Sequence, residues 1–137
     1  MIRVFLSSPY SHPNPAIMED RARMAEDACA WLTGEGYLPL SPIAMWHRSA
    51  ARNNMPTNAN AWMGWNRAWL GASDAVAHLM LEGWEDSAGM AMERAWADEA
   101  DMPQARIGPW MNSFRVHHGQ LHPPRGAVYC DGQWEAV

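Results

Sequence analysis

The stretch that decides the predicted fold is Val4-Phe5-Leu6-Ser7-Ser8-Pro9-Tyr10-Ser11. Residues 2–6 are rich in Ile, Val, Phe and Leu and alternate little with polar residues, which is typical of a buried strand. The residues from Ser7 to Ser11 then break this pattern. We therefore expect a buried strand with a polar loop at its carboxyl end.

The rest of the chain alternates between helical and strand patterns. Asn14-Pro15 fits an N-cap followed by proline at the first helical position. Helices are predicted over residues 16–33, 62–72 and 88–100, and strands over residues 2–6, 37–40, 74–81 and 104–107. Residues 44–60 are polar, rich in Asn and interrupted by Pro56, and we expect an irregular loop there. Such alternation predicts an α/β fold with a parallel sheet.

A chain of 137 residues lies in the size range of one domain. We assign residues 1–107 to the α/β domain and residues 108–137 to a C-terminal extension. In that extension Asp131-Gly132 separates two short strand-like runs, which predicts a small β hairpin with a two-residue turn.

Composition excludes several classes of protein. Apolar residues make up 48% and charged residues 18% of the chain, which is too apolar for disorder, and no window approaches 18 uninterrupted apolar residues. No membrane segment or secretory signal is recognised, so we expect a cytoplasmic protein. Ten basic and fifteen acidic residues give a net charge of −5, so a nucleic acid polymer is not an expected partner.

All ten basic residues are Arg, which excludes Schiff-base chemistry and a phosphate-binding lysine. Cys29 and Cys130 lie far apart, without the spacing of a structural zinc site. His118 and His122 are four residues apart, but glycine and proline nearby argue against the helix that chelation would need. We predict no metal and no cofactor.

Three segments follow predicted strands, namely residues 7–11, 41–47 and 83–93. Because ligands bind outside the carboxyl ends of parallel strands, we expect these segments to converge on a binding site. Ser7 and Ser8 belong to the first segment. In the second, Trp46 is suited to stacking on a base and His47 to proton exchange near neutral pH, although a Trp that covers the core beside a surface His fits equally well.

The third segment contains Ser87, Gly89 and Glu93 in the spacing S-x-G-x-x-x-E. Ser87 opens a helix whose free N–H groups favour an anion, Gly89 permits a close backbone approach, and Glu93 follows almost two turns later. From spacing alone, the simpler interpretation is that Ser87 only caps the helix and that Glu93 is solvated.

These motifs carry a resemblance to a known family. The order of V-F-L-S-S-P-Y-S (residues 4–11), N-R-A-W-L-G-A-S-D (residues 66–74) and the Ser87 to Glu93 motif resembles that of nucleoside 2-deoxyribosyltransferase-like proteins over residues 2–103. The chain looks most like the DUF1937 branch, which carries S-P-Y-S and G-W-E-x-S-x-G. The resemblance implies a doubly wound, flavodoxin-like sheet, metal-free chemistry, a small nucleoside or nucleotide as partner, no membrane, and a homodimer or larger homo-oligomer.

The resemblance also implies roles for individual residues. Glu93 corresponds to the nucleophile that attacks the anomeric carbon and holds the sugar as a covalent ester, and Tyr10 to the residue that positions it. Ser87 corresponds to a position that binds phosphate in the monophosphate hydrolases and is acidic in the transferases.

Asn66 departs from the family pattern, which usually has aspartate at this position. An amide cannot donate and retrieve a proton as a carboxyl group does. Either Asn66 binds the sugar or base while Asp86, Glu85 or His47 supplies the proton, or the protein has lost hydrolysis and only binds nucleotide.

We therefore expect an enzyme that cleaves or exchanges the N-glycosidic bond of a nucleoside or a nucleoside 5′-monophosphate, as an N-glycosidase or a deoxyribosyltransferase. The alternatives are a non-catalytic nucleotide sensor and an oligomeric structural protein with Trp-rich interfaces. Trp62, Trp65 and Trp69 have helical spacing, which favours packing over ligand binding.

Overall fold

The computed structural model describes residues 1–122, 127–130 and 133–136. The elements along the chain are β1 (Arg3–Ser7), α1 (Pro15–Gly34), β2 (Leu38–Leu40), α2 (Pro42–Arg52), α3 (Ala59–Gly71), β3 (Ala75–Leu79), a 3-10 turn (Trp84–Asp86), α4 (Ala88–Glu99), β4 (Gln104–Trp110), β5 (Ser113–Gly119), β6 (Ala127–Cys130) and β7 (Gln133–Ala136).

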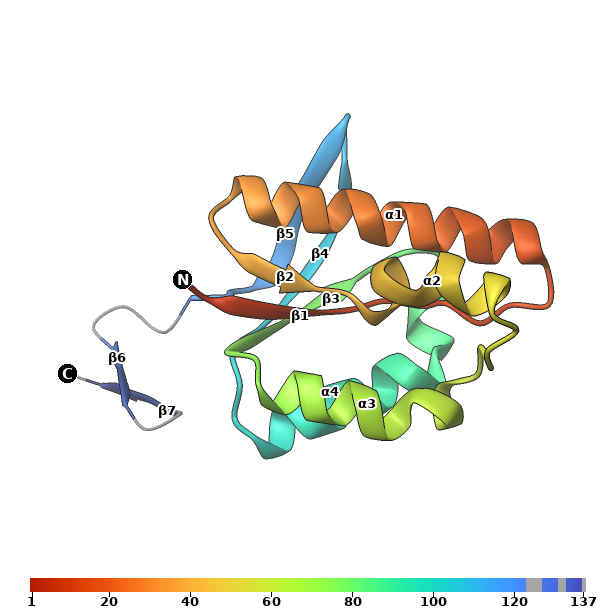
Figure 1. Cartoon of the computed structure of the whole chain (residues 1–137). Coiled ribbons are helices and arrows are strands. Elements are labelled where there is room, and N and C mark those ends of the chain that lie inside the picture. The colour runs from red at the N-terminus through yellow and green to blue at the C-terminus, as the bar shows by residue number, and fades with distance from the viewer. Residues whose placement is uncertain (123–126, 131–132, 137) are drawn as a thin grey trace.

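The protein is an α/β fold built on a five-stranded mixed sheet in the order β2-β1-β3-β4-β5. The first four strands of that order are parallel, and β5 runs antiparallel to β4. Figure 1 shows α1 and α2 on one face of the sheet and α3 and α4 on the other. The expectation of an α/β fold with a parallel sheet is confirmed except for β5.

Alternation along β1 decides which side chains meet which helices. Val4 and Leu6 pack in the larger core cluster with Ala25, Ala28 and Leu32 of α1. Phe5 packs with Val76, Leu70 of α3 and Ala97 of α4. Because successive side chains of a strand point to opposite faces, Ser7 points to the same side as Phe5, toward α4.

Side-chain caps begin each of the four α-helices in the part of the chain that the structure describes. The side chains of Asn14, Ser41, Asn58 and Ser87 accept a backbone N–H of the first helical turn at 2.9, 3.1, 2.9 and 3.2 Å respectively. Each such bond satisfies a donor that has no partner inside the helix. The predicted caps at Asn14 and Ser87 are thereby confirmed.

The predicted loop over residues 44–60 is wrong for its first half, because residues 42–52 form α2. Ser41 caps this helix and Pro42 stands at its first position, which is the same start signal that Asn14-Pro15 gives to α1. The Asn-rich composition concealed the helix, and only residues 53–58 are irregular.

The sheet extends beyond residue 107, where the sequence was expected to leave the α/β domain. β4 continues to Trp110 and returns as β5, with Ala105 paired to Gly119. The predicted C-terminal hairpin is present as the antiparallel pair β6 and β7, while its expected turn residues, Asp131 and Gly132, lie outside the described residues. Among the described helices, none has both the length and the apolar character needed to span a bilayer.

Gly119 provides a test of the β4–β5 register. Its φ is +75°, and a Cβ there would lie 2.2 Å from the carbonyl oxygen of Gln104. Gly119→Ala should therefore lower the free energy of unfolding by about 2 kcal/mol or more, because both the backbone conformation and the clash are unfavourable. Urea denaturation measures this change.

Gly71→Ala is the matched control, because a Cβ at Gly71 would meet nothing within 4 Å. This control should leave stability within about 0.5 kcal/mol of wild type or raise it slightly. Equal stabilities for the two variants would contradict the register described above.

Candidate active site

A cavity of about 820 Å³ lies at the carboxyl edge of the sheet. This volume is in the range of small-molecule sites, roughly 300–1,000 Å³. Its walls come from the loop after β1, the first half of α1, α2, residues 56–66, the loop after β3 and the start of α4. The predicted convergence of the three segments that follow strands is therefore confirmed.

Glu93 is a buried wall residue of this cavity, with 6% of its surface exposed. The Ser7 hydroxyl donates a hydrogen bond of 2.8 Å to Glu93 Oε1. The interpretation of Glu93 as a solvated helix residue is therefore wrong. Ser7 reaches α4 because it points to the same side of β1 as Phe5.

Burial controls the ionisation of Glu93. Removal from water raises the pKa of its carboxyl from 4.5 to about 8, while the hydrogen bond from Ser7 acts in the opposite direction. A carboxyl with that pKa is ionised in roughly one molecule in ten at pH 7. The resting side chain is thus mostly neutral at neutral pH, and Ser7 is the group that favours its anion.

Three buried polar atoms in the cavity wall have no hydrogen-bond partner among the described residues. They are Ser8 Oγ, Trp46 Nε1 and Asn66 Oδ1. Buried polar groups in proteins almost always have a partner, because burying one without a bond costs about 1–3 kcal/mol. One acceptor, one donor and one hydroxyl of the wall residues are therefore left without a hydrogen bond.

Aromatic rings form another part of the wall. Trp46 of α2 and Trp62 of α3 both line the cavity, with ring centroids 5.5 Å apart. Trp65 packs edge-on against both rings, which fixes their positions. Trp62 Nε1 donates to the Pro56 carbonyl at 2.7 Å. The expected packing role fits Trp65, whereas Trp62 also faces the cavity.

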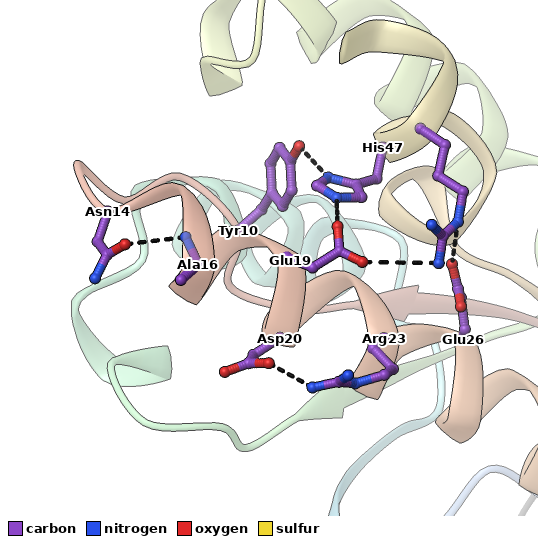
Figure 2. A network of polar contacts seen from close by, with 9 residues as sticks. Tyr10, Asn14, Ala16, Glu19, Asp20, Arg23, Glu26 and His47 are labelled. Carbon is purple, nitrogen blue, oxygen red and sulfur yellow. Dashed lines mark hydrogen bonds and ion pairs between the residues drawn. The ribbon is translucent and has the colours of Figure 1, made fainter. Parts of the chain in front are cut away.

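A second set of polar residues, Tyr10, His47 and Glu19, forms a chain of hydrogen bonds that begins at the cavity wall. Figure 2 shows this chain from close by. The Tyr10 hydroxyl lies 2.6 Å from His47 Nδ1, and His47 Nε2 lies 2.5 Å from Glu19 Oε2. Tyr10 was expected to orient Glu93, but its hydroxyl bonds to His47, and the bond to Glu93 comes from Ser7. This part of the expectation is corrected.

Charged side chains lie beside the Glu19 end of this hydrogen-bond chain. Arg48 lies 3.7 Å from Glu19 and 3.6 Å from Glu26. The hydrogen bond from His47 is the largest cause that lowers the pKa of Glu19, and the charges of His47 and Arg48 add to it. Partial burial and the charge of Glu19 raise the pKa of Tyr10. Nothing in the sequence indicated Glu19, because its role follows only from the packing of α1 on α2.

The start of α4 also faces the cavity. Ser87 caps the helix and lines the cavity, as does Gly89. A Cβ at Gly89 would lie 3.7 Å from the Ala59 Cβ, an ordinary contact, so the protein itself does not require glycine there. Its missing side chain instead leaves room beside the first turn of α4.

The cavity wall carries more acidic than basic groups. Asp20, Glu82, Asp86 and Glu93 line it, against Arg21 and the histidines His12 and His47. The Arg21 guanidinium donates to the backbone carbonyls of Tyr10, Ser11 and Glu82, at 3.3, 3.1 and 3.0 Å. Arg21 thereby joins the loops after β1 and β3.

Several other charged residues lie outside the cavity wall. Asp74 accepts hydrogen bonds from Arg3 at the opposite edge of the sheet, so its role is structural. Glu85, Arg48 and Arg52 do not line the cavity. Within the described residues, no three His, Cys, Asp or Glu side chains are grouped so that they could hold a metal ion.

Comparison with models of known protein families gives a match over most of the chain. A family model described as "Domain of unknown function (DUF1937)" matches residues 2–107. This range includes every residue of the cavity wall. A search of curated proteins found no match.

The raised pKa of Glu93 predicts how stability depends on pH. The native carboxyl holds its proton up to about pH 8, whereas the unfolded chain releases it near pH 4.5. The free energy of unfolding should therefore fall as pH rises through this interval, by an amount on the order of a few kcal/mol. In Glu93→Gln this fall should be largely absent, and the variant should be more stable than wild type at pH 8. Urea denaturation at several pH values measures both effects.

Glu99→Gln is the control, because Glu99 is an exposed carboxyl of the same helix whose nearest ion pair, with Arg67, is 3.8 Å long. It should keep the wild-type pH dependence. An unchanged pH dependence in Glu93→Gln would show that Glu93 is not held neutral by burial.

Proposed function

We propose that this chain, which belongs to the DUF1937 family, cleaves or exchanges the N-glycosidic bond of a nucleoside or nucleotide, with Glu93 as nucleophile. The observation that carries this proposal is the buried Glu93 in the wall of a ligand-sized cavity, bonded to Ser7 at 2.8 Å. A carboxylate is a known nucleophile for glycosyl transfer. A carboxyl that only stabilises a fold is seldom buried without a cationic partner.

The resemblance to nucleoside 2-deoxyribosyltransferase-like proteins supports the same proposal. That resemblance implies a flavodoxin-like sheet, and the strand order β2-β1-β3-β4-β5 is the order of flavodoxin-like sheets. The antiparallel β5 departs from the pattern, but β5 contributes no residue to the cavity wall. We therefore propose this superfamily for the chain.

In the proposed reaction, a Glu93 oxygen attacks the anomeric carbon as the bond to the base breaks. The product is a glycosyl ester, which splits one difficult displacement into two easier steps. Water then releases the sugar in a hydrolase, whereas a second base accepts it in a transferase. Positive charge that develops on the sugar favours the anion of Glu93, and so does the hydrogen bond from Ser7.

The cavity wall suggests how a nucleoside would bind. Trp46 and Trp62 offer aromatic faces for stacking, which is worth about 1–3 kcal/mol per base. Ser8 Oγ, Trp46 Nε1 and Asn66 Oδ1 have no hydrogen-bond partner, and we propose that they bond the polar edges of the base or the sugar hydroxyls after a small adjustment of their side chains. We therefore propose Ser8, Trp46, Trp62 and Asn66 as substrate-binding residues.

The charge of the cavity wall affects whether a phosphorylated substrate can bind. A serine at position 87 is compatible with a phosphate, because it adds no negative charge. Asp20, Glu82 and Asp86 line the same cavity, however, and Arg21 already donates to three backbone carbonyls. Since like charges repel, we propose that a nucleoside is a better substrate than its 5′-monophosphate.

A non-catalytic nucleotide sensor is the second candidate. Asn66 favours it, because nucleoside 2-deoxyribosyltransferase-like proteins usually have aspartate at this position, and an amide cannot donate and retrieve a proton as a carboxyl group does. A sensor would keep its affinity for a nucleoside and would never release free base.

Release of free base tests the proposal. Wild type should release base from at least one of a panel of nucleosides, detected by chromatography, and Glu93→Gln should lose this activity by at least about a thousandfold, because an amide is a poor nucleophile. Nucleoside 5′-monophosphates in the same panel should react more slowly. A requirement for a second free base would identify a transferase.

Glu99→Gln serves again as the control and should keep full activity, because Glu99 lies outside the cavity wall. Measurable binding of a nucleoside without release of base from any substrate would favour the sensor instead.

Asn66→Leu separates ligand binding from stability. Leucine has a similar volume but removes a buried oxygen that lacks a partner, so the free protein should be as stable as wild type or more stable. Affinity for the nucleoside should fall roughly 10- to 100-fold, because a bonded ligand group loses its partner. Calorimetric titration in the Glu93→Gln background measures the affinity without turnover. An unchanged affinity would remove Asn66 from the binding site.

A further inference from the structure

We infer that Tyr10 is the acid that protonates the departing base, that His47 supplies this proton, and that Glu19 holds the imidazole in place. This inference rests on the proposed function and names the group that the reaction still lacks. A base that leaves without a proton carries a negative charge, and a positioned acid accelerates such a step about 10²- to 10⁴-fold. Asn66 cannot act as this acid, and Glu93 is engaged in the ester.

The geometry brings together groups from three elements. Tyr10 comes from the loop after β1, His47 from α2, and Glu19 from α1 (Figure 2). The hydroxyl lies 2.6 Å from Nδ1 and the carboxylate 2.5 Å from Nε2, on opposite sides of the imidazole ring. Hydroxyl, imidazole and carboxylate follow one another as they do in hydrolytic triads.

The hydrogen bonds indicate which nitrogen of the imidazole faces each partner. The lowered pKa of Glu19 keeps its carboxylate ionised, so this carboxylate accepts a hydrogen bond from Nε2–H. Nδ1 is then the nitrogen that exchanges a proton with the Tyr10 hydroxyl. The tyrosine and histidine rings meet at 86°, an edge-on contact that adds to the constraint.

The positions of Tyr10, His47 and Glu19 relative to the cavity indicate the role of each residue. Tyr10 and His47 both line the cavity, on which Glu93 also borders. Glu19 is not part of the wall, so it is a positioning residue that acts through His47. The raised pKa of Tyr10 keeps the phenol protonated at neutral pH, which leaves it a proton to give.

The first step balances without any further reactant. The reacting form has Glu93 ionised, which is the minority form at neutral pH, and His47 as the imidazolium. The bond between the anomeric carbon and the base nitrogen breaks, its electron pair passes to the base, and a bond to a carboxylate oxygen of Glu93 forms. Tyr10 gives its proton to the base nitrogen as the His47 imidazolium returns a proton from Nδ1 to the Tyr10 oxygen. His47 is left neutral.

The second step restores the ionised Glu93 and the His47 imidazolium. The oxygen of water bonds to the anomeric carbon, and the ester bond breaks with its electron pair on Glu93. Tyr10 passes its proton to His47 Nδ1 and takes a proton from the water. The net reaction consumes one water and yields free base and free sugar.

Dependence on the leaving group tests the inference. The two substrates are the nucleoside of the panel that is cleaved fastest and a 4-nitrophenyl glycoside of the same sugar, whose leaving group departs without a proton. Tyr10→Phe should lower kcat/KM for the nucleoside at least about a hundredfold but for the nitrophenyl glycoside less than about tenfold. Glu93→Gln should lose activity on both substrates.

Tyr37→Phe is the matched control. Its hydroxyl lies 2.5 Å from His122 Nε2, so it makes the same kind of contact as Tyr10, but it is outside the cavity wall. This variant should keep wild-type activity on both substrates. Asp86 also lines the cavity and is the other candidate for the acid, so Asp86→Asn tests it. This variant should change kcat/KM for the nucleoside and for the nitrophenyl glycoside by the same factor.

The outcomes separate this inference from the proposed function. Equal losses on both substrates in Tyr10→Phe, no loss on either, or a selective loss in Asp86→Asn would overturn the role of Tyr10 while leaving that of Glu93. If wild type cleaves neither substrate, or if Glu93→Gln stays active, the proposed function falls and the acid role with it.

Circular dichroism verifies that each variant folds. Should Tyr10→Phe be unfolded, Glu19→Gln carries the same comparison, because Glu19 is half-exposed and outside the wall. It should show a smaller loss, about tenfold, on the nucleoside alone. Equal rates for Glu19→Gln and wild type on both substrates would overturn its positioning role.

Discussion

The hydrogen bond between Ser7 and Glu93 is the constraint on which the site depends, because it joins residues 86 positions apart in the buried interior. A carboxyl group that is removed from water needs a partner, and Ser7 is the one that the structure provides. The bond requires that β1 and α4 lie side by side with Ser7 and Phe5 on the same face. A shift of one residue in β1 would turn Ser7 toward α1 and leave Glu93 without its donor.

The parallel strands create the cavity around this bond. β1, β2 and β3 end at the same edge, and each is followed by a segment that enters the cavity wall. Arg21 joins two of these segments through backbone carbonyls, and it passes so close to Gly83 that a Cβ there would lie 2.8 Å from its guanidinium. Local caps start the helices, and the sheet brings them together.

Sequence predicted the parts of this arrangement that depend on local signals. Hydrophobic runs predicted the strands, and Asn14 and Ser87 predicted two helix starts. The Ser41-Pro42 start was missed because the Asn-rich stretch after it reads as a loop. The partner of Glu93 and the contact between His47 and Glu19 were beyond sequence reasoning, because strand alternation and the packing of α1 on α2 decide them. β5 was missed because its apolar residues are few and mostly exposed.

Burial of Glu93 has opposite effects on the resting protein and on the proposed reaction. It raises the pKa of the carboxyl to about 8, so the nucleophilic anion is scarce at neutral pH. The same low-polarity surroundings strengthen the attraction between this anion and a cationic sugar. Deprotonation of Glu93 is therefore most favourable when positive charge develops at the anomeric carbon. Tyr10 and His47 line the same cavity apart from this buried pair, and Glu19 lies behind them, where its ionised carboxylate can balance a charged imidazole. Because their surroundings differ, the Glu93 carboxyl is mostly neutral in the resting protein while the Glu19 carboxyl stays ionised.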